Sequence, residues 1–230
     1  MIRTTIAFAA LLSGTAAQAA ERRFTVSGFE KVQVEGPFQV AVSTGKGSGA
    51  VATGSSAALD RVSVSVEGRT LRIRPNRSAW GTAPKPGEGA VGIALTTHEV
   101  HNVVVAGSGS VALDKAKAMR VALSVSGSGS VRVAAVEADR LDVQLLGAGA
   151  MSLAGKAKSL RASVTGQGAL NAAGLIAEDA ELNADTTGTI ALGVRRAVKI
   201  ASSGAGDVTI GGTPACTLSG LGAGRVRCGK

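Results

Sequence analysis

Apolar and polar residues alternate with a period of two along most of the chain after residue 23. In the second half, the alternation is punctuated by the phrase Gly-x-Gly-x-apolar, which begins at Gly107-Ser-Gly109-Ser-Val111. Six further copies follow, and the first positions of the seven copies are separated by 20, 20, 19, 20, 18 and 18 residues. Alternation with period two is typical of a strand with one buried face, and a fixed repeat is typical of a solenoid. The sequence therefore predicts an all-β fold, a parallel β-helix or solenoid with rungs of 18–20 residues.

The Gly-x-Gly pairs are predicted to form a corner in each rung, because glycine permits positive φ and close stacking of successive backbones. The predicted corner glycines are Gly107, Gly109, Gly127, Gly129, Gly147, Gly149, Gly166, Gly168, Gly188, Gly204, Gly206, Gly222 and Gly224. The copy at Thr186-Thr-Gly188 is degenerate. A second series, at Gly155, Gly174, Gly193 and Gly211, predicts another turn in each rung.

Charged residues recur at fixed distances before the corners, independently of the apolar pattern. Eight residues before four consecutive corners lie Asp139, Lys158, Glu178 and Arg196, and five residues before them lie Asp142, Arg161, Glu181 and Lys199. Residues of equal offset in parallel rungs lie ~4.8 Å apart, where opposite charges attract and like charges repel. Both series alternate in sign, which favours parallel stacking in register.

The N-terminal third has the same strand pattern with a looser repeat. We predict irregular rungs and a cap over residues 24–98, regular repeats over 103–230, and one domain over 20–230. Within the N-terminal part, Ser78 to Ala90 is predicted to be a surface loop around Trp80.

Residues 1–19 have the features of a secretory signal peptide. Arg3 precedes an apolar run from Ile6 to Leu12, and Ala17-Gln18-Ala19 matches a cleavage site. The run is shorter than the ~20 residues of a membrane span, so no transmembrane segment is predicted. We expect an exported protein of the periplasm or cell surface.

The two cysteines, Cys216 and Cys228, predict one disulfide in an oxidising compartment, with two free buried thiols as the alternative.

Composition and charge restrict the partners. The chain has 32 glycines, four phenylalanines, one tryptophan and no tyrosine, which suits a narrow core of aliphatic side chains. Its net charge of +9 favours anionic partners such as envelope glycans, and is equally compatible with plain solubility. Export and the lack of aromatic platforms disfavour nucleic acid.

The opening of the chain resembles a known family. The run from Gly28-Phe29-Glu30-Lys31-Val32 to Gly36-Pro37-Phe38, with the recurring Gly-x-Gly-x-Val phrases, is similar to the head GIN domain family, described as auto-transporter adhesins. The resemblance implies an exported bacterial envelope protein with a right-handed β-helix. It supplies no catalytic or binding motif, so the adhesin description implies little about a site.

The residues show no pattern typical of catalysis. His98-Glu99-x-His101 has neither the spacing nor the helical setting of a zinc motif, and we expect exposed loop histidines there. Glycosidases need two facing carboxylates and calcium-dependent lyases need a carboxylate cluster, whereas the acidic series here alternates with lysine and arginine. We predict no catalytic residue, metal or cofactor. A carbohydrate-active enzyme, of the lyase or hydrolase kind built on a β-helix, remains the alternative.

One cluster is a candidate for binding. Arg72 and Arg74 lie on one face of a predicted strand, and Arg77 and Trp80 follow closely. A guanidinium cluster beside an indole suits an anionic glycan, although a solvated strand face has the same pattern. The sequence therefore predicts a non-catalytic binding or structural module of the envelope, of an adhesin-like kind that recognises glycans or surface proteins.

Overall fold

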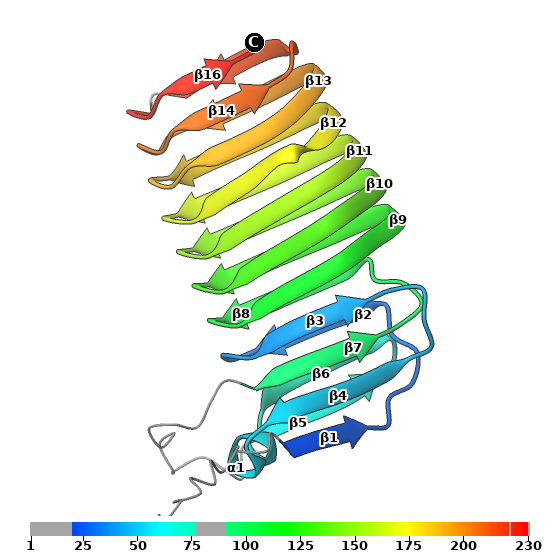
Figure 1. The fold of residues 1–230 in the computed structure, drawn as a ribbon. Helices are drawn as coiled ribbons and strands as arrows, with labels where there is room; N and C mark the ends of the chain where they lie inside the picture. Colours follow the sequence, from blue (N-terminus) through cyan, green and yellow to red (C-terminus); the bar gives the residue numbers. More distant parts are fainter. Residues whose placement is uncertain (1–19, 77–90, 221, 230) are drawn as a thin grey trace, which may run out of the picture.

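The regular half of the chain is a stack of long strands that wind around one core (Figure 1). The computed structural model describes residues 20–76, 91–220 and 222–229. The strands of the regular half are β8 (Asn102–Gly107), β9 (Ser110–Gly127), β10 (Ser130–Gly147), β11 (Ala150–Gly166), β12 (Ala169–Thr186), β13 (Ile190–Ser202), β14 (Val208–Gly211), β15 (Ala215–Ser219) and β16 (Val226–Cys228). Successive rungs pair in parallel, which confirms the predicted solenoid.

Inward side chains of successive rungs stack in columns that fill the core. One column contains Val111, Val131, Met151, Leu170, Ile190, Val208 and Val226. All of these except Val226 are buried. The period-two alternation thus becomes a continuous apolar core, since each rung places its aliphatic residues above those of the rung before.

The two glycines of a corner serve different purposes. Gly127, the first of its pair, has φ +109°, a conformation that residues with a Cβ rarely adopt. Gly129, the second, needs no positive φ, but a Cβ there would lie 2.6 Å from the carbonyl oxygen of Gly109 in the preceding rung. One glycine therefore allows the chain to bend, and the other allows the rungs to stack closely.

The predicted second turn is wrong in one respect. Gly155, Gly174 and Gly193 lie inside strands β11, β12 and β13, so the chain bends there while ladder pairing continues. The ladder register shifts nearby, between Ser152 and Ala154 for example, and this absorbs the difference in length between rungs. Only Gly211 ends a strand.

The N-terminal third builds its rungs from separate short strands. These are β1 (Ala20–Phe24), β2 (Lys31–Glu35), β3 (Gln39–Ser43), β4 (Gly49–Gly54), β5 (Val62–Glu67), β6 (Thr70–Pro75) and β7 (Gly92–Thr96). Strand β2 lies between β6 and β8, and β3 lies between β7 and β9. The rung formed by β2 and β3 comes first along the chain but second in the stack, because β6 and β7 stack beneath it.

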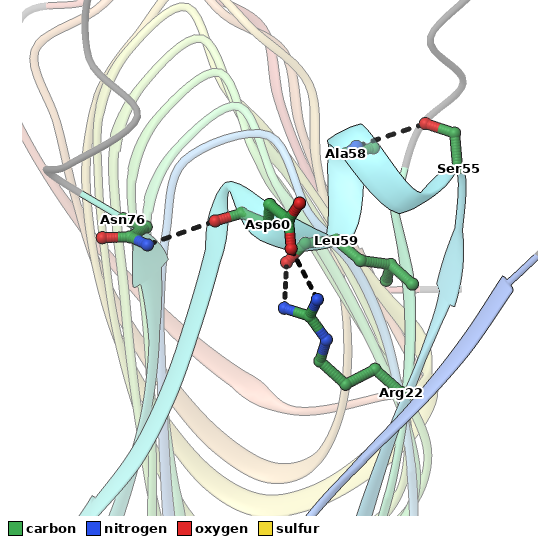
Figure 2. A network of polar contacts seen from close by, with 6 residues as sticks. All are labelled: Arg22, Ser55, Ala58, Leu59, Asp60 and Asn76. Carbon is green, nitrogen blue, oxygen red and sulfur yellow. Dashed lines mark hydrogen bonds and ion pairs between the residues drawn. The ribbon is translucent and has the colours of Figure 1, made fainter.

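Antiparallel strands and a short helix close this end of the stack. Strands β4 and β5 pair antiparallel with β7 and β6, and β1 adds to β4. Helix α1 (Ser56–Asp60), which the sequence did not predict, begins where the Ser55 hydroxyl accepts a hydrogen bond from the Ala58 amide at 3.2 Å. Figure 2 shows Arg22 of β1 reaching the carbonyl of Leu59 and the carboxylate of Asp60 at 3.1 and 2.5 Å.

The disulfide between Cys216 and Cys228 lies at the other end of the stack. Cys216 continues the column of Val198, and Cys228 continues the column of Ile210. Both columns are interior, because Val198 and Ile210 are buried. The disulfide therefore crosses the end of the core and joins two sides of the last rungs.

Candidate functional site

A groove of about 1230 Å³ runs along one side of the solenoid and crosses the rungs of β9 to β13. We call it the charged groove. Each rung contributes the short segment between its two longer sides, such as Lys115–Met119 of β9. Ala118 and Ala138 are half-buried and Ala157 is buried, so small side chains form part of its lining.

Two columns of outward side chains follow the groove. The first column contains Lys117, Glu137, Lys156 and Ile176, which are paired in register on β9 to β12. The second column, two residues further along each rung, contains Met119, Asp139, Lys158 and Glu178. Because the rungs stack in register, the charge of the groove changes from one rung to the next.

Ion pairs join neighbouring rungs within the groove. Glu137 Oε1 lies 2.8 Å from Lys115 Nζ, and its Oε2 lies 3.5 Å from Lys117 Nζ. The hydrogen bond from Lys115 is the main cause of a lowered pKa for Glu137. Asp139 Oδ1 lies 2.8 Å from Lys158 Nζ, and this hydrogen bond raises the pKa of Lys158. Both shifts favour the charged forms of Glu137 and Lys158.

The charge series ending at Arg196 departs from the prediction at its last step. The register between β12 and β13 shifts between Ala177 and Asp179, where β13 has an extra residue. Arg196 consequently pairs with Asp179, with Nε 2.8 Å from Oδ1, and not with Glu178. Arg195 lines the groove instead.

The second charge series lies outside the groove, on the adjoining sheet face. Asp142, Arg161, Glu181 and Lys199 are paired one above another in the predicted register. Arg161 pairs with Glu181 at 3.2 Å, whereas Asp142 pairs with Arg120 of the preceding rung at 2.6 Å. The sequence thus predicted the stacking, but it did not predict that Asp142 forms its ion pair with Arg120, a diagonal neighbour on the preceding rung.

Large apolar side chains are exposed at both ends of the groove columns. Met119 is 81% exposed on β9, and Ile176 is 45% exposed on β12. The outward side chains of the groove columns on the β10 and β11 rungs between them are charged. Met119 and Ile176 therefore offer the apolar contact that a partner could use. No sequence signal marks them as exposed, because apolar residues in this chain usually belong to the core.

The binding cluster predicted from sequence is only partly described. Arg72 and Arg74 lie on the outer face of β6, opposite Ser65 and Ser63 of β5, so they share a face as predicted. Arg72 Nη1 lies 3.1 Å from Glu67 Oε2. Arg77 and Trp80 lie outside the described residues, as does the predicted signal peptide. Arg72 and Arg74 do not line the charged groove, and their grouping with Arg77 and Trp80 stays a prediction.

The histidine pair is split between two environments. His98 is exposed, as predicted, and lines the groove. His101 is half-buried, contrary to the prediction, with Nδ1 3.7 Å from Glu30 Oε2. Burial is the main cause of a lowered pKa for His101, and the charge of Lys31 adds to it. Within the described ranges, no group of three or more His, Cys, Asp or Glu side chains is placed to hold a metal ion.

No helix in the described part of the chain has the length and apolar character of a membrane span.

Comparison with known families gives one match. The model of the family described as "Putative auto-transporter adhesin, head GIN domain" matches residues 28–214. Comparison with curated proteins gives no significant match.

Several solved structures are similar in fold. A putative adhesin from Bacteroides fragilis superposes with a TM-score of 0.84 at 20% identity, over 92% of this chain and 97% of that one. A putative lipid binding protein from Parabacteroides distasonis gives 0.72 at 20% identity, over 93% and 98%. A putative adhesin from Parabacteroides merdae gives 0.68 at 16% identity, over 92% and 96%. At these identities the likeness shows the fold alone.

Proposed function

Since this chain belongs to the head GIN domain family of putative auto-transporter adhesins, we propose that it is an exported, non-catalytic, adhesin-like binding module. The charged groove is its binding surface. One observation carries this assignment: the groove combines its volume of about 1230 Å³ with two exposed apolar side chains and charges of both signs. Neighbouring strands of the rigid stack hold these groups in place.

Export is supported by two features of the sequence. The first 19 residues have the pattern of a signal peptide, whose cleavage stays a prediction. The Cys216–Cys228 disulfide suits an oxidising compartment such as the periplasm or the cell surface.

The acidic groups favour binding over catalysis. A glycosidase needs a carboxyl group whose pKa is raised so that it can donate a proton. In the groove, the pKa of Glu137 is lowered by Lys115, and Asp139 is paired with Lys158. The lowered pKa keeps Glu137 ionised, and both carboxylates are paired with lysines, which suits recognition of charge and does not suit proton donation. A carbohydrate-active enzyme therefore has less support.

Whole-cell binding tests this assignment. Residues 20–230 are labelled and applied to intact bacterial and host cells and to a glycan array, at low and high salt. We expect binding that is lost in the double variant Met119→Ser, Ile176→Ser. The matched control is Leu146→Ser, because Leu146 is 57% exposed on the adjoining sheet face and does not line the groove. Equal binding by the groove variant and the control would contradict the assignment, as would turnover of any glycan on the array.

A further inference from the structure

The partner that fits the charged groove best is a second copy of the same groove. We propose that two copies associate face to face through their charged grooves, with the solenoid axes antiparallel. This inference rests on the proposed binding function and names its partner, which makes the protein a homophilic adhesin.

The charge of the groove alternates rung by rung. The β9 rung carries Asp114, Lys115 and Lys117, the β10 rung Glu137 and Asp139, the β11 rung Lys156 and Lys158, the β12 rung Glu178, and the β13 rung Arg195. The signs are therefore positive, negative, positive, negative and positive. Glu99 precedes them, because the register of β8 on β9 places it about one rung before Met119. The six rungs form a series that begins with a negative charge and ends with a positive one.

An even series of alternating signs is complementary to itself when it is reversed. A two-fold axis perpendicular to the solenoid and passing between β10 and β11 reverses the order of the rungs. The acidic β10 rung of each copy then faces the basic β11 rung of the other, and β9 faces β12. Glu99 faces Arg195 in the same arrangement. Every rung of the groove thus meets a rung of opposite sign.

The central contacts can be assigned residue by residue. The rotation leaves each column facing its own counterpart, so Glu137 faces Lys156 of the second copy and Asp139 faces Lys158 of the second copy. Asp139 and Lys158 are already paired within one chain at 2.8 Å. Two such pairs placed antiparallel form a ring of four alternating charges.

The flanking rungs combine one charged and one apolar side chain each. Lys117 and Met119 of β9 face Ile176 and Glu178 of β12 in the second copy. Met119 therefore lies diagonally across from Ile176, and Lys117 lies diagonally across from Glu178, within reach of these long side chains. This arrangement covers the two exposed apolar side chains of the groove, which are 81% and 45% exposed.

Several groove charges have no intramolecular ion pair. Lys156 and Arg195 form none among the described residues, and neither does Glu99, although all three line the groove. In the antiparallel pair, each of them faces an opposite charge. A second copy therefore supplies partners that the single chain does not.

The spacing and the alternating sign of the rungs favour this partner over an extended peptide or a polyanionic glycan. Rungs are ~4.8 Å apart, whereas side chains on one face of an extended peptide are ~6.6 Å apart. An extended peptide thus loses register with the rungs within about three of them. A polyanion is attracted by the basic β11 rung but repelled by the acidic β10 rung beside it. Only a ligand with the same ~4.8 Å repeat keeps opposite charges aligned along the groove, and a second solenoid has that repeat.

Charge-reversal variants of residues 20–230 test the pairing by sedimentation velocity. Variant one carries Glu137→Lys and Asp139→Lys, and variant two carries Lys156→Glu and Lys158→Glu. Each variant opposes like charges in its own antiparallel pair, so its dimer dissociation constant should rise more than about tenfold. Mixing the two variants restores opposite charges at all four central positions, so a heterodimer should form. The control is Arg161→Glu, which lies outside the groove and should dimerise like the unchanged chain.

Should either double reversal unfold, as judged by circular dichroism, the single reversals Asp139→Lys and Lys158→Asp give the same test. A monomeric unchanged chain at millimolar concentration would overturn the inference, and so would two variants that fail to associate when mixed. An unchanged chain that does not self-associate but binds cells in a Met119-dependent way would overturn only the choice of partner. An unchanged chain that neither self-associates nor binds cells would overturn the proposed function as well.

Discussion

Arg161 lies directly opposite Glu181 on the adjacent rung, and its Nε is 3.2 Å from the Glu181 carboxylate. Asp142 lies on the other side of Arg161 in the same column, although its own ion pair is with Arg120. Arg161 is thus the only cation between two acidic groups in this column.

Reversing this charge should weaken the stack. Arg161→Glu places three acidic side chains in one column, and we expect the free energy of unfolding to fall by ~1 kcal/mol, because exposed charges are screened. Adding Asp142→Lys and Glu181→Lys should recover part of that loss, because the new lysines attract the glutamate at position 161 but oppose Arg120 and Lys199. Urea denaturation of the three proteins measures both steps. A triple variant no more stable than the single one would show that the in-register column does not contribute.

The second glycine of a corner should not tolerate a methyl group. Gly129→Ala places a Cβ 2.6 Å from the Gly109 carbonyl oxygen and 2.8 Å from Val105 Cγ1, so the rungs must separate. We expect a loss of about 2 kcal/mol or more in the free energy of unfolding. Gly47→Ala is the control, because a Cβ there has nothing within 4 Å. Thermal and urea unfolding should separate the two variants clearly, and similar stabilities would refute the stacking role.

The disulfide should stabilise the last rungs more than the centre of the stack. In a solenoid each rung contacts mainly its neighbours, so the effect of Cys216→Ser with Cys228→Ser should stay local. We expect hydrogen exchange to quicken in β14, β15 and β16 while β9 to β11 stay protected. The overall loss should be about 2–3 kcal/mol at most. Uniform loss of protection along the chain would mean that the disulfide stabilises the whole stack.

Mild acid should weaken the N-terminal end through His101. Its pKa is lowered in the folded state, so the unfolded chain binds the proton more readily. The stability from neutral His101 is present above the usual pKa of about 6.5 and is lost as the pH falls through the folded-state value. We expect the midpoint of unfolding to fall between about pH 7 and pH 5, and this fall should shrink in His101→Gln. The exposed His98→Gln serves as the control, and an unchanged pH profile in His101→Gln would exclude this residue as the cause.

Strand pairing in the regular half could be predicted because two independent patterns point to the same register. The Gly-x-Gly interval fixes the rung length, and the column of Asp142, Arg161 and Glu181 fixes which residues stack. The bulge that sends Arg196 to Asp179 could not be predicted, because the 18-residue interval between Thr186 and Gly204 does not show where residues are added or lost within β13. The repeat of the N-terminal third is too loose to indicate that β2 lies between β6 and β8.

The sequence contains a charge pattern that marks part of the charged groove, although the pattern alone does not identify a groove. The series Asp139, Lys158, Glu178 marks one of its columns, and sequence reasoning used it only as evidence for stacking. The first column of the groove, with Lys117, Glu137 and Lys156, does not continue the alternation of charge, because Ile176 follows them. The exposure of Met119 and Ile176 depends on the bend of each rung, which alternation alone does not reveal. The sequence predicts a binding cluster at the arginines near Trp80 instead, because cations beside an indole are a familiar recognition pattern.

The first and last described strands lie at opposite ends of the stack (Figure 1). Tension applied between the two ends of a surface-held copy therefore runs along the solenoid axis, across every ladder in series. Rungs should peel away one at a time, and each released rung of 20 residues lengthens the tether by about 65 Å. The Cys216–Cys228 bond forms a loop that stretching cannot open, so the segment between the two cysteines adds no length under load. Under a pulling force, such a chain would unfold one rung at a time, and the remaining rungs would keep their structure.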